Sequence, residues 1–396
     1  MAAIAFTTLR AAPRRLVAPV LVLAALIAAG LAAALYMESN GHWVTGMTNR
    51  VVWGLPHVFA IFLIVAASGA LNVASIGSVF QRVPYKPLAP LSGLLAVALL
   101  VGGLAVLVLD LGRPDRLTVA MTHYNPRSIF AWNIFLYTGF LAVVAVYLWT
   151  MMVRRLGRYS AGMGRLAFVW RLVLTTGTGS IFGFLVARDT LHSAAMAPLF
   201  IAMSFAFGLA VFLIVLAAVT ALEGGTVAAS LWRRLGRLLG VFVAGQAYFV
   251  LVLHLTDLYA ANGRAMEAAL LTSGNLYCWL FWLGEVGLGV VLPLWLLFRA
   301  VPTRGRALAA AVAVVVGGLV QIYVIVIGGE AYPLDLLPGY VLRSGYGDGQ
   351  WAAYAPTLPE ALLGISGMAI AAAVVLLGCW VLRFLPADLS AGTEGE

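Results

Sequence analysis

The sequence predicts an all-α polytopic membrane protein with about ten transmembrane helices. Hydrophobic residues make up 63% of the 396 residues, charged residues only 10%, and the mean hydropathy is +1.01. A soluble domain carries about 25% charged residues, so this composition excludes a soluble fold. The apolar residues also fall into runs of roughly 20, the length that crosses about 30 Å of hydrocarbon at 1.5 Å per residue.

These apolar runs follow one another along residues 1–396 and predict a single integral membrane domain. The first run follows three arginines, as a signal peptide would, but it is longer than a typical signal h-region and no convincing cleavage site follows. We therefore expect an uncleaved first helix. The expected spans lie near 16–37, 51–80, 89–110, 128–153, 166–187, 198–222, 238–260, 275–299, 307–329 and 360–383.

A weak internal repeat relates two of the expected spans. The segment SIFAWNIFLYTG (128–139) aligns with NLYCWLFWLGEV (275–286), which places Trp132 over Trp279. This match favours two related four-helix bundles, spans two to five and spans six to nine, with peripheral first and last helices. A chance match between aromatic-rich helices is the alternative.

The distribution of basic residues predicts the orientation in the membrane. Most of the 24 Lys and Arg residues lie in segments that are inside if both termini are inside, as the positive-inside rule requires. We therefore expect both termini to lie on the cytoplasmic side. The net charge of +9 sits in short loops between apolar runs, so no nucleic-acid partner is expected. Cys278 and Cys379 lie near opposite ends of different spans, which argues against a disulfide or a cysteine metal site.

The densest polar cluster is the segment 109–135, between the third and fourth spans and outside under this topology. Its polar residues are Asp110, Arg113, Asp115, Arg116, His123, Asn125, Arg127 and Asn133. We interpret the segment as the roof of a redox site. Asp110 would exchange a proton with a quinone, or would instead pair with Arg113 or Arg116. His123 would hydrogen-bond the quinone and titrate near neutral pH, or would be an ordinary loop histidine.

Other outer segments contribute candidates to the same site. His57 lies about six residues, or 9 Å, below the outer end of the second span and beneath Trp53. His57 either lines the quinone pocket or is an interior histidine whose ring nitrogens are hydrogen-bonded within the protein. Asp189 and His192 follow the fifth span, where Asp189 either joins the site or neutralises Arg188. The long outer segment 330–359 is of a length that is usually functional or contacts a partner.

Polar residues within the spans suggest a proton path. An ionisable side chain at the bilayer centre costs roughly 2.5–3.5 kcal/mol, so it tends to face the bundle interior. Glu285 lies near the middle of the eighth span and is expected to be protonated or paired, with Arg171 as one candidate partner. His254 and Asp257 share a face of the seventh span and are either a proton relay or a structural ion pair. Gln246 completes the candidate path.

Four segments resemble a known family. WGLPHVF, DLGRPDR, HYNPRSIFAWN and FWLGEVGLGVVLP are similar to the NrfD/polysulfide-reductase-C membrane subunits, and the ten-helix layout resembles the branch with the hydrogenase-2 membrane subunit and the P subunit of the DsrMKJOP complex. The resemblance covers nearly the whole sequence. Its most specific part is DLGRP with the following N-P-x-S-x-x-x-W, here Asn125, Pro126, Ser128 and Trp132.

The resemblance implies a quinone-interacting subunit of a respiratory or sulfur-metabolism complex in the bacterial inner membrane, not active alone. It implies menaquinone or ubiquinone near the periplasmic face, no metal or haem in this protein, and electron exchange with a periplasmic ferredoxin-like 4Fe-4S subunit. Asp110 and His123 would then exchange protons with the quinone. The expected quinone-binding residues are Trp53, His57, Arg113, Asn125, Ser128, Trp132, Asp189 and His192, and the expected proton path is Arg171, Gln246, His254, Asp257 and Glu285.

Two alternatives stay open at this point. A haem-b cytochrome would need facing axial histidines, for which His57 and His254 are the only candidates within spans. A secondary transporter would use Glu285 and an unwound helix, such as TTGTGS at 175–180, at a midplane substrate site.

Overall fold

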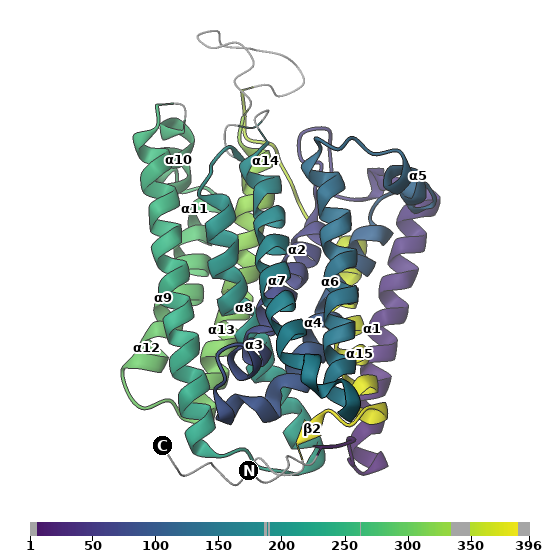
Figure 1. Ribbon diagram of the computed structural model, residues 1–396. Coiled ribbons are helices and arrows are strands. Elements are labelled where there is room, and N and C mark those ends of the chain that lie inside the picture. Colours follow the sequence, from purple (N-terminus) through teal and green to yellow (C-terminus); the bar gives the residue numbers. More distant parts are fainter. Residues whose placement is uncertain (1–5, 186–187, 189–190, 262, 334–348, 387–396) are drawn as a thin grey trace.

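The computed structural model is almost entirely helical and describes residues 6–185, 188, 191–261, 263–333 and 349–386 (Figure 1). Within this part of the protein, ten helical stretches are long and apolar enough to cross a membrane, which confirms the predicted fold class. In lipid each backbone N–H and C=O must find a partner within the protein, and an apolar run satisfies this requirement as a helix.

The first half of the sequence forms the first five crossings. The elements in order are β1 (Phe6–Thr7), α1 (Pro13–Asn40), η1 (His42–Val44), α2 (Leu55–Ala70), α3 (Asn72–Ser78), η2 (Val83–Leu88), α4 (Ala89–Leu109), η3 (Pro114–Arg116), α5 (Leu117–Thr122), α6 (Ile129–Met152), η4 (Arg154–Tyr159) and α7 (Ser160–Gly183). Proline stands in the first turn of α1, α2 and α4, where its missing N–H costs nothing.

The second half forms the other five crossings, two of which include π-helical turns. The elements in order are α8 (Met196–Glu223), α9 (Ala229–Tyr259), α10 (Arg264–Thr272), α11 (Leu276–Trp279), η6 (Leu280–Val291), α12 (Leu292–Phe298), α13 (Arg304–Tyr323), η7 (Val324–Gly328), α14 (Gly329–Ala331), α15 (Leu358–Val381) and β2 (Leu385–Pro386). Both η6 and η7 are π-helical, and such wide turns often occur at functional sites.

Successive crossings alternate in direction, so the molecule has two distinct ends (Figure 1). The termini face holds β1 and β2, which pair antiparallel with Phe6 opposite Pro386. The site face, at the other end, holds the carboxyl end of α4, the start of α2 and the short helix α5 (Figure 1).

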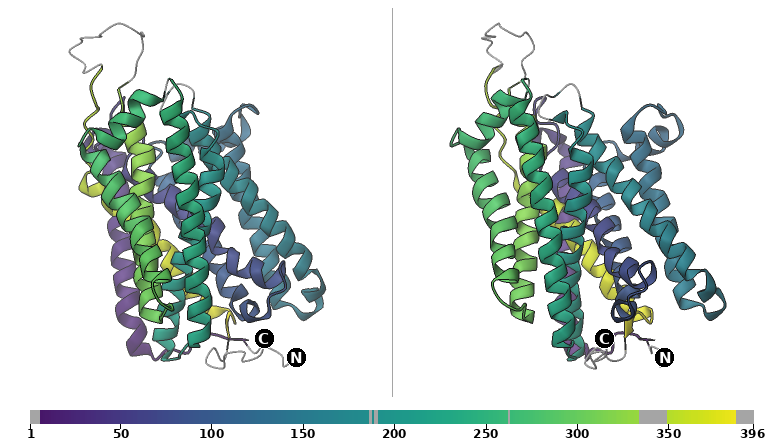
Figure 2. Two further views of the ribbon diagram at one scale, coloured as in Figure 1. Left: turned by 90° about the vertical axis from the view of Figure 1, so that its left-hand side faces the viewer. Right: turned by 60° about the vertical axis from the view of Figure 1, so that its left-hand side comes forward.

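Helix α8 lies at the centre and packs against α2, α7, α9 and α13. The α6–α7 hairpin stands at one edge of the bundle and the α9–α13 helices at the opposite edge (Figure 2). Helix α1 is the least buried crossing and packs on α15, which in turn packs on α2 and α4.

The α2–α8 crossing is closer than any side chain would permit. A Cβ atom built on Gly69 would lie 1.5 Å from the Ser204 carbonyl oxygen, and one on Gly208 would lie 2.0 Å from the Gly69 carbonyl carbon. Small residues allow such backbone contact between membrane helices. This contact holds the carboxyl end of α2 against the central helix α8.

We expect Gly69→Ala to destabilise the fold by more than the ~1–3 kcal/mol typical of overpacking, because the new methyl meets backbone rather than a movable side chain. Gly245→Ala is the matched control, since a Cβ there meets nothing within 4 Å. Thermal unfolding monitored by size-exclusion chromatography measures the effect. Equal midpoints for the two variants would contradict the tight crossing.

Candidate functional site

A buried carboxylate lies between two histidines on the site face. Asp110 ends α4, and its side chain is 0% exposed. The Nδ1 atom of His57 lies 2.7 Å from Asp110 Oδ2, and the Nε2 atom of His42 lies 3.8 Å from Oδ1. The two imidazole side chains are 15% and 28% exposed, respectively. We call these three residues the His–Asp cluster.

Local sequence explains how three distant segments meet at this cluster. Pro56 sits in the first turn of α2 and places His57 there. Gly112, two residues after Asp110, has a φ of +67°, which glycine adopts without strain. A Cβ at Gly112 would lie 3.0 Å from the His42 ring, so this turn also makes room for the second imidazole.

The Asp110 carboxylate is incompletely satisfied within the protein. Neither of its oxygens has a hydrogen bond of normal geometry from any described residue, and the same holds for His57 Nδ1 and His42 Nε2. The 2.7 Å separation is thus a close imidazole–carboxylate contact rather than a linear hydrogen bond. A buried polar group without a hydrogen bond costs about 1–3 kcal/mol, and native structures rarely leave several together. The cluster is therefore suited to a ligand that donates and accepts hydrogen bonds.

Trp53 forms an aromatic wall beside the cluster. Its indole stacks on His57 with ring centroids 6.1 Å apart and an interplanar angle of 23°. It also meets the edge of Phe182 from α7 at 5.6 Å and Phe130 from α6 at 6.2 Å. A flat apolar surface next to polar groups suits a planar ring with polar substituents.

Two further buried glutamates hold the loops around the cluster. Glu330 Oε2 accepts a hydrogen bond from the Trp53 backbone N–H at 3.0 Å. The Arg188 guanidinium donates to the carbonyl oxygens of Glu330 and Arg50 at 2.9 and 2.7 Å. These bonds join the segment before α2 to α14 and to the segment after α7. Asp189, which follows Arg188, lies outside the described residues.

Glu360, the second of these glutamates, also holds the loop that precedes α2. It forms a capping box with Thr357 at the start of α15 and accepts from Gly46 N–H at 2.9 Å. Tyr354 donates to Glu360 at 2.8 Å and accepts from Leu55 N–H at 2.7 Å. Burial and the Glu360 carboxylate raise the pKa of Tyr354 well above its usual value, so its hydroxyl stays protonated as a donor.

Some expected site residues lie away from the cluster. His123 follows α5, a short exposed helix that carries it away from the end of α4, and its Nδ1 atom lies 3.0 Å from Thr122 Oγ1. Trp132 is 54% exposed, and its Nε1–H donates to Pro126 O. Neither His123 nor Trp132 has a contact with Asp110 among those described, so their convergence on Asp110 stays a prediction. His57 does contact Asp110, and Trp53 stacks on His57.

The remaining residues of the expected roof form local contacts. Arg113 pairs with Asp115 at 3.0 Å rather than with Asp110, and this bond lowers the pKa of the Asp115 carboxyl. Asn125 accepts from the Arg127 N–H at 2.9 Å. Ser128 is half-buried just before α6, and His192 is exposed.

A second polar cluster connects the helices at the opposite edge of the bundle. Gln246 of α9 donates to Gln321 of α13 at 2.7 Å, and Gln321 donates to Glu285 of η6 at 2.9 Å. His254 Nδ1 lies 2.8 Å from Glu267 Oε1 on α10. His254, Asp257, Glu267, Glu285 and Gln321 line a small pocket of about 40 Å³, roughly the space of one water molecule.

Two expected pairings in this region are corrected by these contacts. His254 pairs with Glu267 rather than Asp257, because α10 folds back against α9. Glu285 bonds Gln321 rather than Arg171. Arg171 lies on α7, where its guanidinium is 4.8 and 5.0 Å from the Phe168 and Phe205 rings and donates to Ser68 O.

Sequence reasoning missed His42, Glu330, Tyr354 and Glu360. Only Glu360 had a local signal, the T-x-x-E pattern of a capping box at Thr357–Glu360. The facing histidines that a haem would require are not observed as a pair: His57 and His254 contact different carboxylates, Asp110 and Glu267. Among the described residues, no group of three His, Cys, Asp or Glu side chains is arranged to hold a metal ion.

Comparisons with known proteins find one family and several relatives that match most of the sequence. The family model described as "Polysulphide reductase, NrfD" matches residues 43–333. An Hdr-like menaquinol oxidoreductase integral membrane subunit from Archaeoglobus fulgidus is 27% identical over 375 residues, covering 93% of each protein. A putative dimethyl sulfoxide reductase membrane subunit from Halobacterium salinarum is 29% identical, covering 93% of this protein and 91% of the relative. A polysulfide reductase component from Wolinella succinogenes is 25% identical, covering 62% and 82%.

We expect Glu360→Ala to loosen the loop that precedes α2, because Gly46, Thr357 and Tyr354 would lose a buried acceptor at about 1–3 kcal/mol for each donor left unsatisfied. Hydrogen exchange should show faster exchange over residues 41–55. The exposed Glu38→Ala serves as control. Unchanged protection in Glu360→Ala would show that this carboxylate does not hold the loop.

Proposed function

Because the protein belongs to the NrfD family of polysulphide reductase membrane proteins, we propose that it is the quinone-interacting membrane subunit of an oxidoreductase complex. The names of its relatives support this proposal, since they include membrane subunits of menaquinol oxidoreductase and dimethyl sulfoxide reductase and a component of polysulfide reductase. We propose the His–Asp cluster as the quinone site.

The observation that carries the proposal is the buried, unsatisfied carboxylate of Asp110 between His57 and His42. A quinone changes by two electrons and two protons, so its oxygens need groups that accept or donate protons. Asp110 contacts His57 Nδ1, which leaves the Nε2 atom of His57 to face a quinone oxygen. The carboxylate thereby sets the orientation of the imidazole, as carboxylates do in other His–carboxylate pairs.

The neighbouring groups complete a site of the required chemistry. Trp53 offers its ring face beside His57 and would pack against the quinone headgroup. His42 is the most exposed member of the cluster and would pass protons between Asp110 and the site-face solvent. This assignment uses Trp53, His42, His57 and Asp110, and it does not use His123 or Trp132.

We propose that the site face is periplasmic and that the termini face is cytoplasmic. The excess of basic residues in the loops of the termini face supports this orientation. The site then lies close to a periplasmic iron–sulfur subunit, which would exchange electrons with the quinone. A membrane subunit in a complex, rather than an independent enzyme, agrees with the names of the relatives.

The second polar cluster supports a further proton route within the membrane. Gln246, Gln321 and Glu285 form a continuous hydrogen-bonded series across three helices, and the adjoining pocket admits about one water. We propose that Glu285 takes part in proton transfer. A pocket of about 40 Å³ is too small for an organic substrate, since ligand pockets measure roughly 300–1,000 Å³, so this observation does not favour a secondary transporter.

We expect Asp110→Asn to lower quinone-linked electron transfer at least ~10²-fold, the usual contribution of a positioned acid or base. The amide keeps the shape of the carboxylate but cannot accept a proton. The assay is the rate of quinol-analogue oxidation or quinone-analogue reduction by the intact complex in native membranes, normalised to the amount of assembled protein. His123→Ala is the control and should retain near wild-type rates. A wild-type rate for Asp110→Asn, or inactivation by His123→Ala alone, would refute the assignment.

We expect Glu285→Gln to preserve quinone turnover while reducing proton movement across the membrane, because the amide retains a hydrogen bond to Gln321 but carries no titratable proton. Proteoliposomes that contain the complex allow turnover and pH change to be recorded in the same sample. Loss of turnover in this variant would place Glu285 in the quinone site rather than in a proton route. An unchanged ratio of protons moved to electrons transferred would show that Glu285 is not part of the proton route.

A further inference from the structure

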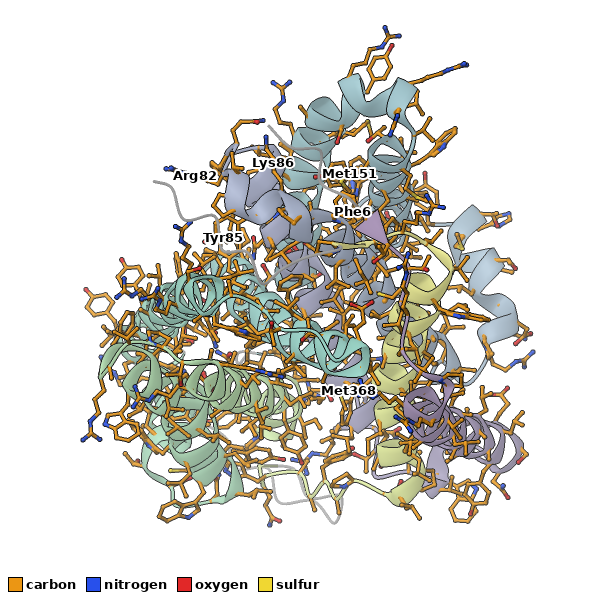
Figure 3. The ribbon with its side chains drawn as sticks, turned by 90° about the horizontal axis from the view of Figure 1, so that it is seen from below. Phe6, Arg82, Tyr85, Lys86, Met151 and Met368 are labelled. Atoms are coloured by element: carbon orange, nitrogen blue, oxygen red, sulfur yellow. The ribbon has the colours of Figure 1, made fainter. Side chains whose placement is uncertain are left out.

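The termini face contains a pocket that the proposed function does not use. Its volume is about 850 Å³, within the range of pockets that bind small molecules. It lies among the ends of α3, α6 and α15 and the start of α7. Figure 3 views this face from below and shows Phe6, Lys86 and Met151, from three separate elements, gathered in one region.

The charged side chains that line this pocket in the described part of the protein are all basic. Lys86, Arg154 and Arg383 line it, and none of the lining residues in the described part of the protein is an aspartate or glutamate. These three cations come from η2, η4 and the segment after α15, so the fold collects them from distant parts of the sequence. Like charges gathered in one hollow repel one another, and this repulsion is relieved by a bound anion.

A further feature of the lining is suited to an anion. Tyr147 is almost completely buried and lines the pocket, and its hydroxyl, which lies near Ser78, has no hydrogen bond of normal geometry among the described residues. A buried hydroxyl in this state is able to donate to an oxyanion.

The rest of the lining is mainly apolar, with a few neutral polar side chains, and part of it reaches the lipid-facing surface. Met151, Met152 and Val381 belong to the pocket, and Met152 and Val381 are 48% and 60% exposed at the ends of α6 and α15. A free inorganic anion would gain nothing from these side chains. A ligand with a phosphate group and hydrocarbon chains would use both parts of the pocket.

We propose that this pocket binds one anionic phospholipid, with its phosphate near Lys86, Arg154, Arg383 and the Tyr147 hydroxyl and its acyl chains against Met152 and Val381. Basic pockets between membrane helices on the cytoplasmic side are known to take such headgroups. The proposal does not depend on the quinone site, which lies on the opposite face.

The test uses the full-length protein, stripped of lipid in detergent and titrated with short-chain phosphatidylglycerol by native mass spectrometry. Phosphatidylcholine and inorganic phosphate are tested in parallel. We expect one tightly held phosphatidylglycerol, at least ~10-fold weaker binding of phosphatidylcholine, and little displacement of the bound lipid by millimolar phosphate.

Variants separate the pocket from the general positive charge of this face. Lys86→Gln/Arg154→Gln/Arg383→Gln should weaken phosphatidylglycerol binding at least ~10-fold. Arg155→Gln/Arg233→Gln/Arg237→Gln removes the same charge from exposed positions of the same face and should leave binding unchanged. Tyr147→Phe should weaken binding several-fold, and this single variant keeps the test decisive if the triple variant does not fold.

Three results would overturn the proposal. Equal losses of phosphatidylglycerol binding in the two triple variants would indicate that the lipid is attracted non-specifically to the positive charge of the termini face. Equal binding of phosphatidylcholine would show that the basic residues do not select the ligand. Efficient displacement by inorganic phosphate would show an anion site without a lipid.

Discussion

The contact between Asp110 and His57 sets how the site face is assembled. A carboxylate removed from water loses solvation worth several kcal/mol, which only a nearby partner restores. Asp110 is shielded at the end of α4, and its partner stands in the first turn of α2, 2.7 Å away. The start of α2 must therefore meet the end of α4, and Trp53, stacked on His57, is positioned as a consequence.

Other buried acids in the structure act in the same way. Glu330, Glu360 and Glu267 each bind a group from a different segment: the Trp53 N–H, the Tyr354 hydroxyl and the His254 ring. Since apolar packing between helices in lipid lacks the hydrophobic driving force of a soluble core, such polar contacts contribute to specificity. They fix the loops and helix ends, whereas small residues such as Gly69 fix the distance between helices.

The amino-acid sequence was sufficient to predict the membrane crossings and some residues of the candidate site. Apolar runs of membrane length are a local property, so the ten predicted spans agree with the ten observed. Asp110, His57 and Trp53 were identifiable because each borders an apolar run. His42 was not, since it reaches the cluster through a turn at Gly112 that allows close approach. His123 looked close to Asp110 by sequence separation, but α5 intervenes. His254 and Asp257 have helical spacing, yet Glu267 arrives from a different helix.

The packing of α1 on α15 has a consequence for biosynthesis. The two helices touch closely, since a Cβ on Gly30 would lie 2.1 Å from that of Ser366. However, more than 300 residues separate α1 from α15 in the sequence, so the ribosome releases α1 into the bilayer long before α15 has been synthesised. At 5–20 residues per second this interval is on the order of 20–60 s. During that time α1 has only lipid, or an insertion factor, along the side that later meets α15, and its docking must be among the last events of assembly.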